Sequence, residues 1–410
     1  MSGSNLSLKD QIESAQVRIA SRFIEQCTQG KQTTSLPQNA AACGQFLGDD
    51  AIHNSQRGLH GTAAAIQVLA RHGNEPAREL VPKLVEYVQN RDILESANHA
   101  LAEKAKGDRR NVIKISEVLY ALSFVQTGLS AKDKLVAELA DSLRKCKITG
   151  SGWGYFIGEA IAQPLPTCYA ILGLCRCGYD VTDTAKYLLT ASAKLGVGST
   201  QQHKQQHDLT IATLTLYALT YSGLKLSDAD NRQAQATFRR LWRHLEPMLA
   251  WDIEQNIAYW HSTENHYVRL PWQLYLFALS SQYSRWRFSS VLLQVRLRTL
   301  LAAVIKDEFF YPHSEGITSA RTYSIAYDCL DVVRRSLETR RVMRVAIIWD
   351  TIRRFFGRRW LRVLLMIILV GFMFAIVIRW SITSDDPVEV APELIGIGLT
   401  SLLSLLGKRE

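Results

Sequence analysis

Side chains that can transfer protons or bind ligands gather in the segments that precede apolar stretches of the chain. Seven of the ten histidines fall in these segments, together with aromatic and acidic residues. Imidazoles beside carboxylates can carry out acid–base chemistry or bind a metal ion. The competing interpretation is that each polar side chain caps a helix or satisfies loop backbone. The candidate ligand-binding residues are His60, Trp153, Tyr155, His207, Asp208, His261, Glu264, His266 and His313.

Sequence motifs do not assign a reaction to these candidates. The chain has no recognisable phosphate-binding loop and no Ser–His–Asp signature. Its seven cysteines are an odd number, and four of them fall in apolar segments, which indicates free thiols in a reducing compartment. Cys175 and Cys177 point to different faces of a helix and make a poor metal pair. Catalytic residues, metal and cofactor therefore remain unassigned.

One stretch, residues 150–178, shows how the candidates are positioned. Its GSGWGY segment combines glycines that permit a tight turn with two large aromatic rings. Pro164 and Pro166 predict that no helix begins before about Thr167, which would be the N-cap. An apolar run follows, and Gly178 is expected to close the helix as a left-handed C-terminal glycine. A helix this apolar must be surrounded by protein.

The same pattern recurs six times. The ends of successive copies lie 45 to 59 residues apart, long enough for two helices and two loops. The copies are residues 62–73, 116–128, 167–178, 209–223, 271–282 and 322–333. Amphipathic segments, each with one polar face, alternate with them. These segments are residues 14–27, 76–90, 131–146, 184–195, 229–250 and 289–307.

The GSGWGY…PxPTCYAILGL pattern in residues 150–174 resembles the α/α-toroid proteins of the terpene-cyclase and protein-prenyltransferase (squalene oxidase repeat) type. The likeness spans roughly residues 14–333, but only this copy matches sharply. It implies an all-α fold, an (α/α)6 toroid of about six helical hairpins, in which the candidate loops meet at one end. An open helical solenoid with the same repeat is the alternative.

The catalytic signatures of these families are missing. The strings around Asp228 and Asp49 do not supply the acids of the cyclase DxDD motif in order. Asp328 and Cys329 are adjacent, whereas the prenyltransferase zinc ligands are spaced. The cysteines also lack the neighbouring histidine of the lanthionine-forming toroids. The resemblance therefore implies neither terpene-cyclase nor protein-prenyltransferase activity for this chain.

Most of the net charge of +10 comes from one segment. Between residues 334 and 362, ten arginines outweigh two acidic residues. Because most of the excess positive charge lies in this segment, which directly precedes an apolar span, specific nucleic-acid binding is not expected. We divide the chain into a toroid domain at 1–335, a basic juxtamembrane segment at 336–359, a transmembrane helix at 360–380, and an acidic linker with a short apolar tail at 381–410. The 21-residue span is long enough to cross a bilayer and is bordered by Trp360 and Trp380.

The positive-inside rule places the N-terminal domain in the cytoplasm. The N-terminus has no secretory signal. We therefore expect a single-pass membrane protein whose toroid binds a protein segment, a lipid or a small hydrophobic ligand in its loop-end cavity. The alternative is a terpenoid cyclase- or prenyltransferase-like enzyme that takes an isoprenoid substrate from the bilayer.

Overall fold

The computed structural model describes residues 7–29, 40–44, 46–47, 58–90, 111–125, 130–194, 202–245, 259–261, 267–269, 272–283, 297–299, 301–302 and 318–339. The chain divides into two units, Met1–Val345 and Ala346–Glu410, and every described residue lies in the first. Helices dominate this unit, and the four strands among the described residues are only two or three residues long. The predicted all-α class is confirmed.

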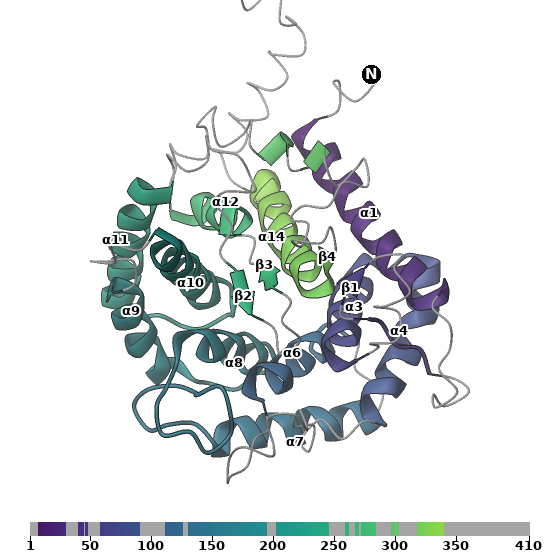
Figure 1. The fold of residues 1–410 in the computed structure, drawn as a ribbon, viewed down its shortest axis with the longest axis horizontal. Coiled ribbons are helices and arrows are strands. Elements are labelled where there is room, and N and C mark those ends of the chain that lie inside the picture. Colours follow the sequence, from purple (N-terminus) through teal and green to yellow (C-terminus); the bar gives the residue numbers. More distant parts are fainter. Residues whose placement is uncertain are drawn as a thin grey trace, which may run out of the picture. The chain divides into compact units, whose positions relative to one another are not determined.

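Six apolar helices coincide with the six predicted repeat copies. Each packs against the next in the sequence order, and the last packs against the first. Figure 1 shows α1, α4, α7, α9 and α11 lying outside them. The apolar composition explains this position, since ten consecutive residues of the third helix, from Leu165 to Leu174, are buried. The inner helices are α3 (Leu59–His72), α6 (Val112–Leu122), α8 (Pro164–Arg176), α10 (Gln202–Tyr221), α12 (Trp272–Tyr283) and α14 (Ala320–Thr339).

The amphipathic segments form the outer helices. In α4 the buried residues recur at helical spacing, and charged residues occupy the other face. The predicted segment 289–307 is described only at residues 297–299 and 301–302, which are helical. The outer helices are α1 (Leu8–Gln29), α4 (Glu75–Gln89), α7 (Ser130–Lys145), α9 (Ala185–Lys194) and α11 (Asp228–Leu245), with a 3-10 turn, η1 (Thr182–Thr184), before α9.

The inner helices run in the same direction. For each neighbouring pair of helices, two contacts are compared. The contact nearer the C-terminus of one helix is also nearer the C-terminus of the other. The contacts are His60–Arg321 and Gln67–Asp328 for α3 and α14, Ser116–Gly173 and Leu119–Cys177 for α6 and α8, Cys168–Thr215 and Cys175–Ser222 for α8 and α10, and Tyr217–Tyr275 and Thr220–Tyr283 for α10 and α12. The N-termini of these helices therefore lie at one end of the unit.

Two short antiparallel pairs accompany the helices. β1 (Phe46–Leu47) pairs with β4 (Thr318–Ser319), so a segment before α3 is joined to the segment before α14. β2 (Tyr259–His261) pairs with β3 (Tyr267–Arg269) between α11 and α12.

The GSGWGY turn is fixed to α8 by the hydroxyl of Thr167. This oxygen accepts a hydrogen bond from the Trp153 amide at 3.0 Å and donates to the Gln163 carbonyl at 2.6 Å. The predicted helix start at Thr167 is wrong, because α8 begins at Pro164 after an extended Gln163. Proline is well suited to the first helical position, where its fixed φ is helical and its missing N–H is not needed.

The predicted closing glycine of α8 is confirmed. Gly178 has φ +86°, a left-handed conformation, and its amide donates to the Cys175 carbonyl. Gly73 and Gly223 close α3 and α10 in the same conformation. None of the seven cysteines, all of which are described, forms a disulfide bond.

The C-terminal predictions fall mostly outside the described residues. Helix α14 runs to Thr339, so the predicted domain boundary after residue 335 lies inside a helix. The basic segment beyond residue 339, the span 360–380 and the tail 381–410 are not described. Among the described helices, none combines the length and the apolar character needed to cross a membrane.

Candidate ligand-binding site

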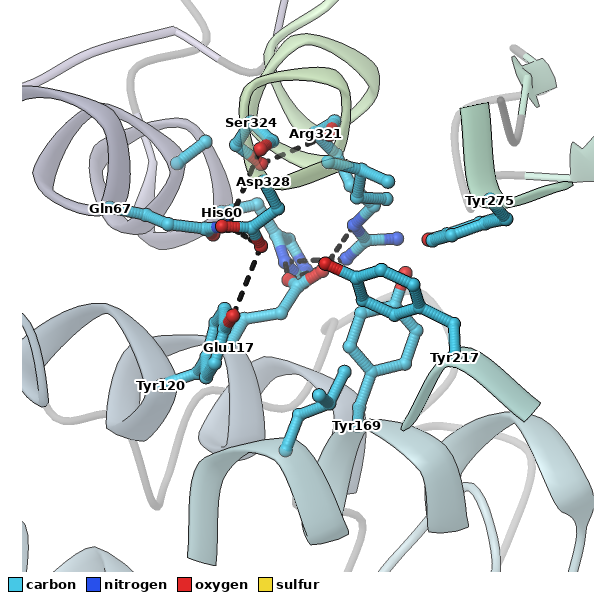
Figure 2. Close-up of a pocket in the computed structure, with 13 residues that line it drawn as sticks. His60, Gln67, Glu117, Tyr120, Tyr169, Tyr217, Tyr275, Arg321, Ser324 and Asp328 are labelled. Atoms are coloured by element: carbon cyan, nitrogen blue, oxygen red, sulfur yellow. Dashed lines mark hydrogen bonds and ion pairs between the residues drawn. The ribbon is translucent and has the colours of Figure 1, made fainter. Parts of the chain in front are cut away.

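A pocket lies among the inner helices, and all six contribute to its wall (Figure 2). The lining residues of α3 and α14 recur at helical spacing, so each helix presents one face. The space is narrow, and the cavity that water-sized molecules can occupy measures about 30 Å³. The lining residues are His60, Ala64, Gln67, Glu117, Tyr120, Tyr169, Leu172, Tyr217, Tyr275, Arg321, Ser324, Ile325 and Asp328.

Four consecutive inner helices each give the pocket one tyrosine. These are Tyr120 from α6, Tyr169 from α8, Tyr217 from α10 and Tyr275 from α12. The rings of Tyr217 and Tyr275 have their centroids 5.0 Å apart at 53°. Burial raises the pKa of all four phenols, so they stay neutral and can donate or accept a hydrogen bond at physiological pH.

The first polar cluster joins three helices near the N-termini of α3 and α14. Arg321 binds Glu117 through two nitrogens, with Nη2 2.6 Å from Oε2 and Nε paired with Oε1. His60 Nδ1 lies 2.5 Å from the same Oε2 and 2.9 Å from Arg321 Nη2. The Glu117 and Arg321 side chains are only 13% and 12% exposed.

Electrostatics give this cluster one ion pair and a neutral imidazole. Burial raises the pKa of Glu117, but the charge of Arg321 and the hydrogen bonds from Arg321 and His60 outweigh this effect, so the net pKa is lowered and the carboxyl is ionised. Burial lowers the pKa of His60 below 6.5, against the raising effect of Glu117, and the charge of Arg321 adds to the lowering. A neutral imidazole with its proton on Nδ1 donates to Glu117.

The second polar cluster lies one to two helical turns further along the same helices and centres on Asp328. Its Oδ1 pairs with Arg71, while Oδ2 accepts from Gln67 Nε2 at 2.5 Å and from the Tyr120 hydroxyl at 3.1 Å. Arg71 also lies over the Phe124 ring, 4.4 Å from its centroid. Burial raises the pKa of Asp328, against the lowering effect of Arg71.

The pocket thus combines aromatic walls with carboxylates that already form ion pairs with arginines of the same chain. Glu117 faces Arg321, and Asp328 faces Arg71. This arrangement favours holding a ligand over supplying a free acid or nucleophile. Across the described ranges, no three histidine, cysteine or acidic side chains are grouped to hold a metal ion.

Of the predicted site residues, His60 lines the pocket. Trp153 is fully buried beneath its turn, where its indole donates to the Leu143 carbonyl, and Tyr155 is half-buried beside the turn. Neither is among the lining residues. Asp208 lies on α10 and does not line the pocket.

The remaining predicted residues are not tested. His207 and His261 lie in α10 and β2, but their side chains are outside the description. Glu264, His266 and His313 are outside the described residues altogether.

Sequence reasoning missed most of the pocket because it looked in the loops. The polar residues that matter lie within the apolar helices, and Glu117 and Asp328 are acidic residues inside predicted buried copies. That position was the available signal, since acidic residues are rarely buried without a partner. The chain matches no protein-family model, and no characterised protein has significant sequence similarity to it.

Proposed function

We propose that this chain is a binding module built as an (α/α)6 toroid of the terpene-cyclase and prenyltransferase repeat type. Two observations support the closed toroid over an open solenoid. The inner helices contact one another in a closed circuit, since α14 packs against α3. The two polar clusters also join helices whose residues are about 260 positions apart in the chain, such as Gln67 and Asp328.

The binding function rests on the pocket among the inner helices, which we call the axial pocket. Its wall comes from all six inner helices, and its carboxylates are held by arginines of the same chain. A pocket of this kind can recognise a protein segment, a lipid or a small hydrophobic ligand through its tyrosines and apolar residues.

The proposal includes attachment to a membrane. It rests on the uncharged centre of residues 360–380 and on the arginine-rich segment that precedes it. The axial pocket is then cytoplasmic, by the positive-inside rule.

The alternative is an isoprenoid cyclase- or prenyltransferase-like enzyme. Two features favour it: tyrosine rings can stabilise a carbocation, and burial raises the pKa of Asp328, as a proton donor requires. Against it, Asp328 is paired with Arg71 and accepts two hydrogen bonds, which hold it as a carboxylate. The binding module is therefore the better-supported function.

Native mass spectrometry of the full chain in lipid nanodiscs tests the binding function. Ala64→Leu fills the axial pocket, while Ala70→Leu, on the same helix, adds the same atoms away from the lining. We expect a co-purified small molecule in the wild type and in Ala70→Leu, but not in Ala64→Leu. Equal occupancy in both variants would reject the pocket as the binding site.

The enzyme alternative has its own assay. Geranylgeranyl diphosphate is incubated with the wild type and with Asp328→Asn in the presence of Mg²⁺, and its consumption is followed by chromatography. Binding alone predicts no turnover. Turnover that is lost in Asp328→Asn would establish the alternative.

A further inference from the structure

The two carboxylates that line the axial pocket, Glu117 and Asp328, are each compensated by an arginine. Arg321, the partner of Glu117, also lines the pocket, whereas Arg71, the partner of Asp328, does not. The remaining basic lining residue, His60, is uncharged near neutral pH because burial lowers its pKa. The four tyrosines are also neutral.

This balance limits what can enter. A charged ligand gives up its hydration on burial, and that loss is compensated only if it meets an opposite charge. A ligand anion would approach Arg321 but also meet the Glu117 carboxylate, whose two oxygens occupy Nε and Nη2. A ligand cation would be attracted by the Glu117 carboxylate but repelled by the Arg321 guanidinium. Either charge would have to break an existing buried ion pair.

Tyrosine hydroxyls supply what a neutral ligand needs. Figure 2 shows the side chains of Tyr169, Tyr217 and Tyr275 directed toward the region of Arg321. A phenol hydroxyl can exchange hydrogen bonds with a hydroxyl or carbonyl oxygen, and the rings offer flat apolar contact. The Tyr217 hydroxyl also hydrogen-bonds Cys329. Leu172 and Ile325 add further apolar wall.

We infer that the axial pocket selects a ligand without net charge, a slender apolar molecule carrying a hydroxyl or carbonyl oxygen. This inference rests on the proposed binding function and specifies its ligand class. Lys114 also lies close enough to act on Glu117, but it is not a lining residue, so a ligand in the pocket would not contact it.

Three probes of equal chain length test the inference: 1-hexanol, hexanoate and hexylammonium. Each is titrated by ligand-observed NMR at pH 7.5 against the full chain in nanodiscs, with empty nanodiscs and Ala64→Leu as blanks. We expect hexanol to bind about tenfold more tightly than either charged probe, since burying an uncompensated charge is costly. Tighter binding of a charged probe would overturn the inference but leave the binding function intact. If no probe binds more weakly to Ala64→Leu than to the wild type, the binding function itself fails.

Charge-altering variants sharpen the test. Glu117→Gln leaves the Arg321 guanidinium without its carboxylate, so the preferred probe should change to hexanoate. Arg321→Gln should change it to hexylammonium by the same reasoning. The double variant Glu117→Gln/Arg321→Gln restores neutrality and should prefer hexanol again. An unchanged preference in a folded single variant would contradict the charge argument, and where a variant does not fold, the wild-type ranking still decides.

The neutral ligand could come from the bilayer or from the cytoplasm. Nanodiscs preloaded with 1-hexadecanol separate these sources, because this alcohol stays in the lipid while hexanol is delivered from water. Binding of both alcohols supports a lipid-derived ligand, and binding of hexanol alone supports a soluble one.

Discussion

Glu117 holds the first polar cluster together, because its carboxylate contacts both Arg321 and His60. A buried ion pair contributes little compared with a well-packed apolar pair, but removing one partner leaves the other charge uncompensated. We expect the pair to contribute specificity, since it joins α6 to α14.

Glu117→Gln should therefore lower the free energy of unfolding by about 3–5 kcal/mol. The double variant Glu117→Gln/Arg321→Gln should lose less than the single variant, since it leaves no buried charge. Denaturant unfolding of the full chain in detergent, followed by circular dichroism, measures both. Glu138→Gln on the exposed face of α7 is the control and should change little. A double variant less stable than the single one would contradict the interpretation.

His60 makes stability depend on pH. Its pKa is lowered in the folded chain, so between that folded value and 6.5 the unfolded chain binds more protons. Stability from this residue is complete above pH 6.5 and falls as the pH drops through this window. Burial lowers the pKa of His72 too, which adds a slope of the same sign.

His60→Gln should flatten this dependence. We expect the melting temperature of the wild type to fall more between pH 8 and pH 5.5 than that of the variant. Comparing the two slopes cancels the contribution of Asp328, whose raised pKa acts in the opposite direction. His244→Gln, an exposed histidine, is the control and should keep the wild-type slope. Equal slopes for His60→Gln and the wild type would contradict the buried, neutral imidazole.

At the scale of the helix, Gly178 shows how a single residue ends an element. A Cβ added to this residue would meet no atom within 4 Å, so any penalty comes from φ +86° alone. Gly178→Val should lower the free energy of unfolding by about 1–2 kcal/mol, because a β-branched residue resists the left-handed region. Gly178→Asn should cost less, since asparagine tolerates that region. Equal melting temperatures for the two variants would show that the backbone strain argument is wrong.

The helices themselves were predictable from the sequence because the signal is local. An apolar run that ends at glycine needs only its own residues to be recognised, as at Gly178 and Gly223. The start of α8 differs from the predicted start because Pro164 occupies the first helical position, where proline is tolerated.

The pocket was harder to predict because it depends on contacts between distant residues. Gln67 and Asp328 meet although 261 positions separate them. No local pattern gives that pairing, and the catalytic motifs of the resembled families are absent. A lone acidic residue in an apolar helix indicates that a partner exists, but not which residue it is.

For the whole folded unit, the circuit of inner helices is completed by the contacts between α14 and α3. Besides the two polar clusters, the pairing of β1 with β4 brings the segments before these helices together. Closing a long chain segment costs entropy that grows slowly with its length. The contacts between α14 and α3 must offset that cost, and α14 also packs against α12 and α1.

The end of α14 therefore decides where the domain can be cut. Leu337 is 1% exposed, and the Ser336 hydroxyl donates to Ser281 Oγ of α12 at 3.1 Å. A chain ending at residue 340 keeps both contacts and removes the proposed membrane span, while a chain ending at residue 335 loses them. We expect the 340-residue chain to be helical and monomeric without detergent, and the 335-residue chain to be less stable by about 2–4 kcal/mol, as for loss of a buried leucine. Circular dichroism, size-exclusion chromatography and thermal unfolding measure these properties. If the 340-residue chain aggregated or lost helicity, residues beyond 340 would be part of the folded unit and the anchor would not be separable.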